Sequence, residues 1–233
     1  MQWLFKNNIS HRGLHNSNFC ENSLSAFQNA MNHGFAIELD VQLTKDKQLV
    51  VFHDENSFRL TNKSFDIVAT TYDELKSLTL LDTDDKIPLL SEVLALVKGK
   101  VPLLIEIKNN DFTSELEMQL ALLLDAYKGE IAVCSFNYES IKWFGEHRPN
   151  FLRGLNFGDI QTLTVKDFVQ FLYYFDRSEP NFVSLDYALL ESFIVKYCQF
   201  FKIPMVCWTI DSEEKKETAL KKVQGIICEK IIP

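Results

Sequence analysis

Short apolar runs alternate along the chain with longer segments whose apolar residues recur every three or four positions. In one longer segment, Leu116, Leu120, Leu123 and Leu124 follow helical spacing. The pattern predicts strands at 8–10, 35–41, 102–107, 131–136, 152–157, 182–185, 205–210 and 225–228. It predicts helices at 23–33, 89–98, 113–127, 138–147, 165–175, 191–201 and 212–222. Eight strands alternating with helices favour an α/β fold, a TIM-type (β/α)8 barrel, with a doubly wound open sheet as the alternative.

One segment interrupts the alternation, directly after the second predicted strand. Residues 42–53 leave no room for a crossover helix, so 49–53 should fold back antiparallel on 35–41. A turn near 45–47 places His53 roughly opposite Asp40. Residues 54–88 then form a small insertion on the barrel top with one short helix around 73–78. We expect one domain over residues 1–233.

Composition narrows the function. The 233 residues carry a formal charge of −8, which argues against a nucleic-acid-binding surface. No apolar run reaches the ~18 residues of a membrane span, and the N-terminus lacks the apolar core of a signal peptide. The five cysteines are odd in number and form no Cys-x-x-Cys pair. These features predict reduced, buried thiols in a cytoplasmic protein that acts on a small molecule.

Two predicted strands place acidic side chains on one face. Glu38 and Asp40 alternate with apolar residues, so both carboxylates point the same way, and Glu106 and Lys108 repeat the arrangement. Three inward carboxylates form an all-oxygen site for one divalent cation, Mg²⁺ or Ca²⁺. The alternatives are solvated acids on an exposed edge strand and a buried ion pair between Glu106 and Lys108, although Lys108 could instead meet a phosphate.

Two histidines should arrive at the same end of the barrel. His11 and Arg12 close the first strand, before Gly13, and His53 ends the folded-back strand. The carboxyl ends of barrel strands carry the chemistry, and one histidine can remove a proton while the other donates one. Trp208 either fills the barrel or walls the pocket. The remaining histidines are interpreted as surface residues: His15, His33 and His147. The segment Glu21, Asn22 and Ser23 is interpreted as the start of a helix.

With these residues in view, the chain resembles the glycerophosphodiester phosphodiesterase family. Motifs typical of that family follow one another in order over almost the whole chain, and together they are highly specific. They are His11-Arg-Gly13, Glu21-Asn-Ser23, Ala26-Phe27, Glu38-Leu-Asp-Val41, Thr44-Lys-Asp46, Val50-Val-Phe-His-Asp54, Pro88-Leu-Leu-Ser-Glu-Val-Leu94, Ile105-Glu-Ile-Lys108, Ser135-Phe136 and Cys207-Trp-Thr-Ile210.

The resemblance implies a metal-dependent phosphodiesterase on a TIM-type barrel. It implies a divalent metal on Glu38, Asp40 and Glu106, acid–base catalysis by His11 and His53, and Arg12 and Lys108 facing the phosphate, with Trp208 near the substrate. The expected substrates are glycerophosphodiesters such as glycerophosphocholine or glycerophosphoethanolamine, which would yield glycerol 3-phosphate and an alcohol.

Two departures from the family pattern are Asp211, where Asn is common, and Cys228-Glu229, where Thr-Asp or Ser-Asp is common. Neither falls within the predicted catalytic set, so we expect them to affect substrate detail. Two alternatives to the expected function stay open. One is a lysophospholipase D-type enzyme with an apolar groove that certain phenylalanines would supply. The other is an inactive binding or scaffold barrel. The candidate groove residues are Phe52, Phe58, Phe65 and Phe157.

Overall fold

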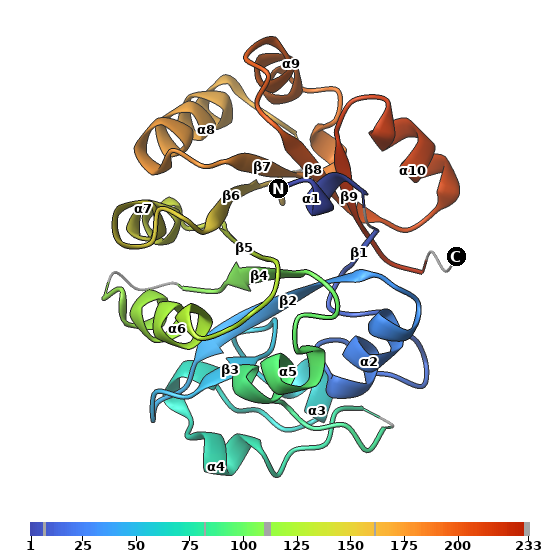
Figure 1. Cartoon of the computed structure of the whole chain (residues 1–233), viewed down its shortest axis with the longest axis vertical. Helices are drawn as coiled ribbons and strands as arrows, with labels where there is room; N and C mark the ends of the chain where they lie inside the picture. The colour runs from blue at the N-terminus through green and yellow to red at the C-terminus, as the bar shows by residue number, and fades with distance from the viewer. Residues whose placement is uncertain (7, 82, 110–112, 161, 231–233) are drawn as a thin grey trace.

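Eight parallel strands close into a barrel within the residues that the computed structural model describes, which are 1–6, 8–81, 83–109, 113–160 and 162–230 (Figure 1). The ring closes because β1 pairs with both β2 and β9. The (β/α)8 barrel is thus confirmed, and the open-sheet alternative is wrong. Around the ring, the strands are β1 (Ile9–Ser10), β2 (Ala36–Leu43), β4 (Leu103–Ile107), β5 (Ile131–Ser135), β6 (Leu152–Phe157), β7 (Phe182–Asp186), β8 (Met205–Ile210) and β9 (Gly225–Cys228).

Helices surround the strands, and their apolar stripes pack against the outside of the barrel (Figure 1). Leu116, Leu120 and Leu124 are buried there, as their spacing predicts. All seven predicted helices form, with ends shifted by no more than a few residues. They are α2 (Leu24–Asn32), α5 (Leu90–Val97), α6 (Glu115–Asp125), α7 (Tyr138–His147), α8 (Val165–Ser178), α9 (Phe193–Phe200) and α10 (Glu213–Leu220); a turn, η2 (Tyr187–Leu189), precedes α9.

The segment after β2 folds back as predicted, with a small difference in register. The short strand β3 (Leu49–Val51) pairs antiparallel with β2, and the Phe52 amide donates to the Asp40 carbonyl at 3.0 Å. Phe52 therefore lies opposite Asp40, and His53 comes one residue later. Between β3 and α5 the chain makes three short helical turns instead of the one predicted: α3 (Phe58–Thr61), η1 (Ile67–Ala69) and α4 (Tyr72–Leu75).

A short N-terminal helix that the sequence pattern did not predict, α1 (Trp3–Lys6), closes the amino-terminal end of the barrel. Trp3 and Leu4 are buried against interior side chains of the strands. The Gly225 backbone lies so close to the Leu4 carbonyl that a Cβ there would approach the oxygen to 2.2 Å. Because this end is filled, side chains at the carboxyl end of the strands are the ones that can line a cavity. Among the described residues, no helix has the length and hydropathy to cross a membrane.

Candidate active site

A pocket of about 260 Å³ opens at the carboxyl ends of the strands. Seven of the eight site residues predicted from the sequence line it, and the eighth, Asp40, lies directly behind its wall. Trp208 is half-buried and forms part of this wall. The lining residues are His11, Arg12, Glu38, His53, Glu106, Lys108, Cys134, Phe136, Asn156, Asp159, Ser184, Trp208, Thr209 and Ile227.

Three carboxylates from the neighbouring strands β2 and β4 converge at one side of the pocket. Asp40 and Glu106 are paired in register, and one oxygen each of Glu38, Asp40 and Glu106 lies within 4.8 Å of the others. All three side chains are buried. Burial, with the charges of Asp40 and Glu106, raises the pKa of Glu38 well above its usual value. Such a set of oxygen donors fits a hard divalent cation, which would replace mutual repulsion by attraction.

Two cations accompany these acids. Lys108 Nζ lies 2.5 Å from Glu106 and 3.2 Å from Asp40, and Arg12 Nε lies 3.5 Å from Asp40. Burial alone would raise the pKa of Asp40, but the charges of Lys108, His53 and Arg12 lower it to about 2. Burial raises the pKa of Glu106 to about 7 against the opposing charge of Lys108. The Glu106–Lys108 ion pair, expected as an alternative to a cation site, thus forms within the three-carboxylate cluster.

His11 follows β1 and presents one ring edge to the pocket. Its Nδ1 lies 2.8 Å from the Glu229 carboxylate, which is also 3.4 Å from His15 Nε2. Glu229 follows the last strand and belongs to the Cys228-Glu229 departure from the family pattern. We expected this departure to lie outside the catalytic set, but Glu229 contacts His11 directly. His15, interpreted as a surface residue, belongs to the same group. The rule that functional side chains follow barrel strands could have identified Glu229.

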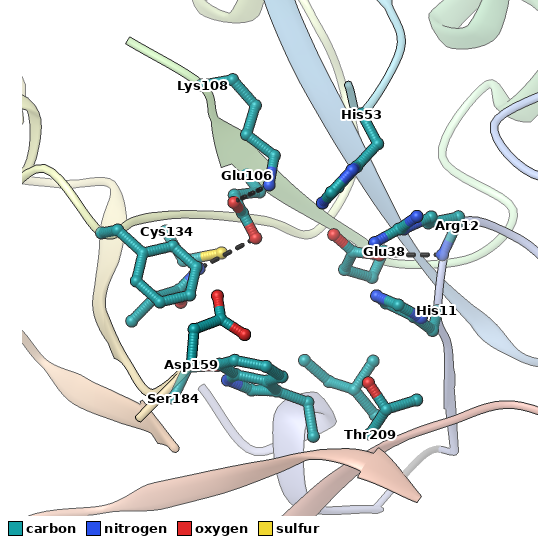
Figure 2. Close-up of a pocket in the computed structure, with 14 residues that line it drawn as sticks. His11, Arg12, Glu38, His53, Glu106, Lys108, Cys134, Asp159, Ser184 and Thr209 are labelled. Carbon is teal, nitrogen blue, oxygen red and sulfur yellow. Dashed lines mark hydrogen bonds and ion pairs between the residues drawn. The ribbon is translucent and has the colours of Figure 1, made fainter. Parts of the chain in front are cut away.

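His53 is oriented in a similar way. Its Nδ1 lies 2.8 Å from Asp54, whose carboxylate accepts a hydrogen bond of 2.6 Å from Arg59 Nε. Burial lowers the pKa of His53 below its usual value. Because Nδ1 is engaged in both His11 and His53, Nε2 is the ring nitrogen of each that remains for the pocket. Figure 2 shows both rings directed into it.

The loop between β1 and α2 supports the acidic cluster. The Arg12 amide donates to Glu38 at 2.8 Å, and Asn22 Nδ2 donates to Asp40 at 2.8 Å. Arg12 also donates to Glu21 at 2.6 Å. Ser23 caps α2 as predicted, but the support given by Glu21 and Asn22 was missed. Their place in the Glu-Asn-Ser motif was the available signal.

Gly13 makes this loop possible. Its φ is +82°, and a Cβ there would meet the Phe27 ring at 2.9 Å. Glycine adopts this backbone region without strain and has no side chain to collide with α2. The His11-Arg12 pair can therefore turn out of β1 and over the carboxylates.

The other side of the pocket, on β6 to β8, has few charges. Asn156 donates to Glu106 at 3.0 Å, which links the two sides. Its Oδ1 atom, the Ser184 hydroxyl and Trp208 Nε1 are buried and have no hydrogen-bond partner among the described residues. Buried polar groups are normally paired, so these three atoms are available to a bound molecule or to water.

Comparison with known proteins agrees with this geometry. The model of the glycerophosphoryl diester phosphodiesterase family matches residues 11–232. The chain belongs to this family. It is 33% identical to a glycerophosphodiester phosphodiesterase of Caldanaerobacter subterraneus subsp. tengcongensis, over 95% of this chain and 93% of the relative. It is also 39% identical to human lysophospholipase D GDPD1, over 47% of this chain and 38% of that protein.

Solved structures of phosphodiesterases share the fold. The glycerophosphodiester phosphodiesterase of Thermotoga maritima matches with a TM-score of 0.77 and 27% identity, over 94% of this chain and 92% of that one. An Oleispira antarctica phosphodiesterase, determined in complex with the product sn-glycerol-3-phosphate, matches with a TM-score of 0.83 and 20% identity, over 96% and 93% of the two chains. The present chain is accordingly a phosphodiesterase of the glycerophosphodiester-hydrolysing family, and the inactive-scaffold alternative is set aside.

Proposed function

We propose that this enzyme hydrolyses glycerophosphodiesters such as glycerophosphocholine and glycerophosphoethanolamine to glycerol 3-phosphate and an alcohol. One observation carries the proposal: two histidines and three carboxylates from separate strands share one pocket at the barrel mouth. The product bound to the Oleispira antarctica phosphodiesterase supports the same chemistry here.

In this proposal one divalent cation, Mg²⁺ or Ca²⁺, would be held by Glu38, Asp40 and Glu106. When bound, it would offset negative charge on the phosphate in the transition state. Arg12 and Lys108 face the same phosphate and add to that stabilisation. The Arg12 and Lys108 side chains lie beside the carboxylates before substrate arrives, so little reorganisation is needed during the reaction.

His11 and His53 transfer the protons. One accepts a proton from the attacking oxygen, which belongs to water or to the neighbouring glycerol hydroxyl, and the other donates a proton to the departing alkoxide. Attack by the hydroxyl gives a cyclic phosphate, which water then opens to glycerol 3-phosphate. The phosphorus–oxygen bond to the leaving alcohol breaks as the new one forms. Glu229 and Asp54 hold the two rings through Nδ1, which keeps each Nε2 directed at the reacting atoms. Trp208 forms part of the wall against which the substrate lies.

Lysophospholipids are the second candidate substrate class, because human lysophospholipase D GDPD1 is among the relatives. Such a substrate needs an apolar groove for its acyl chain. Phe52 and Phe157 are buried in the core and Phe65 is partly buried, whereas Phe58 is 60% exposed. Three of the four phenylalanines considered for such a groove are therefore not free to form it, which favours the glycerophosphodiesters.

We further propose that residues 1–233 act as a single barrel domain, with 54–88 as its insertion. Side chains of the insertion pack on Val50 and Phe52 at the edge of the barrel. The five cysteines are buried and free of disulfides, which supports a reducing compartment, the cytoplasm.

The decisive experiment measures glycerol 3-phosphate release from glycerophosphocholine in chelator and after Mg²⁺, Ca²⁺ or Mn²⁺ is restored. We expect release only with metal. Folded protein that releases nothing with any cation, but does cleave lysophosphatidylcholine, would favour the second substrate class. Release that persists undiminished in chelator would contradict the metal site.

A further inference from the structure

Asp159 is held in a defined place at the rim of the pocket. It follows β6 with a φ of +56°, and its amide donates to the Asp186 carboxylate at 3.2 Å. The preceding Gly158 packs against the neighbouring strands: a Cβ there would lie 2.4 Å from Asp186 Cβ and 2.8 Å from a ring carbon of Trp208. Only glycine allows this approach, so the local packing fixes the backbone that carries Asp159.

The Asp159 carboxylate points into the pocket, across from His11 and Glu38 (Figure 2). No hydrogen bond or ion pair to this carboxylate is found among the described residues, whereas Glu38, Asp40 and Glu106 all have partners. An unpaired carboxylate repels the phosphate of any substrate that enters. The side chain is exposed to solvent at the rim, where its charge would attract a positively charged part of the same substrate.

Two aromatic rings also line the pocket, and Lys108 Nζ lies 6.0 Å from the ring centroid of one of them, Phe136. Phe136 and Trp208 both line it and meet edge to face, with ring centroids 5.7 Å apart. Aromatic faces attract cations, and quaternary or primary ammonium groups are commonly bound by rings together with a carboxylate. Alkyl substituents on the nitrogen pack on the rings while the charge meets the acid.

We propose that Asp159, Phe136 and Trp208 form an ammonium subsite, through which the enzyme selects diesters with a cationic amine head group over those with a neutral one. The inference rests on the function proposed above and specifies its substrate class. It also divides the pocket: the phosphate lies at Arg12 and Lys108, and the head group extends toward Asp159.

The test compares kcat/KM for glycerophosphoethanolamine and for glycerophosphoglycerol, whose head group is neutral. Asp159→Asn keeps the size and hydrogen-bonding oxygen of the side chain and removes the charge. We expect the ratio of the two constants to fall about fivefold, since one partly exposed ion pair is lost while the aromatic rings remain. Asp159→Glu should retain most of the ratio. Asp176→Asn, which removes an exposed acid on α8 outside the pocket, should leave it unchanged.

An independent readout uses the unmodified enzyme. Choline should inhibit glycerophosphoglycerol hydrolysis at a concentration at least tenfold lower than glycerol does, and this difference should shrink in Asp159→Asn, where the rings remain and the charge is removed. A wild-type enzyme that hydrolyses both diesters, with a ratio unchanged by Asp159→Asn, overturns the subsite and leaves the proposed function standing. A wild-type enzyme that cleaves no glycerophosphodiester overturns both.

Discussion

The two sides of the pocket differ in how their polar groups are satisfied. On the β1–β4 side, the carboxylates of Glu38, Asp40 and Glu106 are held by cations, amides or backbone N–H groups of the protein itself. Arg12 Nε and Glu106 Oε1 on this side make no hydrogen bond to a described residue but lie in ion pairs. On the β6–β8 side, Asn156 Oδ1, Ser184 Oγ and Trp208 Nε1 have no hydrogen-bond partner among the described residues. The first side is organised before substrate binds, and the second presents groups that only a bound molecule or water can satisfy.

This difference indicates that the two sides of the pocket have different roles. Charges that stabilise a transition state must be fixed in advance, and the β1–β4 side fixes them through short contacts within the protein. Groups that recognise a variable head group can remain without a hydrogen-bond partner until the ligand binds, at a moderate cost in folding stability. The two sides meet where Asn156 donates to Glu106, so the proposed recognition side and the carboxylates proposed to bind the metal share one hydrogen bond.

Loss of either histidine should have the largest effect. His11→Ala or His53→Ala removes a proton-transfer group and should lower kcat by ~10²-fold or more on every diester. Steady-state kinetics with thermal melting as a folding check would measure this. His33→Ala provides a matched control because this histidine is exposed at the end of α2. Near-normal turnover in either pocket variant would remove that histidine from the mechanism.

The crowded carboxylates should make the metal-free protein sensitive to pH. Burial raises the folded-state pKa of Glu106 from 4.5 to about 7, so its stabilising protonated form is present at pH 4.5 and lost as the pH rises through 7. In chelator, stability should therefore fall between pH 5 and 8, by about 2 kcal/mol. Urea unfolding at several pH values would measure it.

Two controls separate the cluster from other titrations. Added Mg²⁺ or Ca²⁺ should flatten the pH trend, because a cation compensates the ionised acids. Glu106→Gln should reduce the trend in chelator as well, leaving the part that the raised pKa of Glu38 contributes. A metal-free wild type whose stability is constant or rises across this range would contradict the assigned crowding.

Glu229 offers a milder test of the β1–β4 side. Glu229→Gln keeps the side-chain size but weakens the contact that orients the His11 ring, so kcat should fall about tenfold with KM little changed. Glu229→Asp, the acid common in the family, should recover part of this loss. Thermal melting of the same variants would separate this loss from a loss of folding, since a merely structural role would lower stability together with kcat.

The motifs of the β1–β4 side could be found from sequence because they combine rigid strand periodicity with rare residue types. Glu38 and Asp40 alternate on one strand, and parallel pairing brings Glu106 beside them. Glu229 and His15 were harder, since their contact with His11 depends on how distant segments close the ring. The β6–β8 side was predicted least: Asn156, Ser184 and Asp159 are common residue types in no recognisable motif, and only folding places them together.

Helix α1 was missed for a related reason. A four-residue helix is too short to show a periodic pattern of apolar residues. It is stabilised by Trp3 and Leu4, which pack against the amino-terminal end of the barrel. The insertion shows the same limit: the pattern indicated one short helix, but α3, η1 and α4 form because Leu60, Ile67 and Leu75 pack together.

The smallest expected effect concerns the outer support of the β1–β4 side. Burial would raise the pKa of Glu21, but its hydrogen bonds and charge contacts with Arg59 and Arg12 lower it from 4.5 to about 2. The ionised form therefore adds stability above pH 4.5, and this contribution is lost as the pH falls toward 2. Glu21→Gln should destabilise the protein by about 1 kcal/mol at pH 7, and by progressively less below pH 4.5.

Chemical denaturation of wild type and Glu21→Gln across pH 3 to 7 would measure this difference. Asp73→Asn, an exposed acid on α4, is the control that should change stability little over the same range. Activity sharpens the result, because Glu21 holds Arg12, which contacts Asp40 in the three-carboxylate cluster. If Glu21→Gln lowers stability but leaves kcat/KM unchanged, Asp40 and the backbone of Arg12 are sufficient to position the Arg12 side chain. The contacts that organise the β1–β4 side for the reaction then do not extend to Glu21.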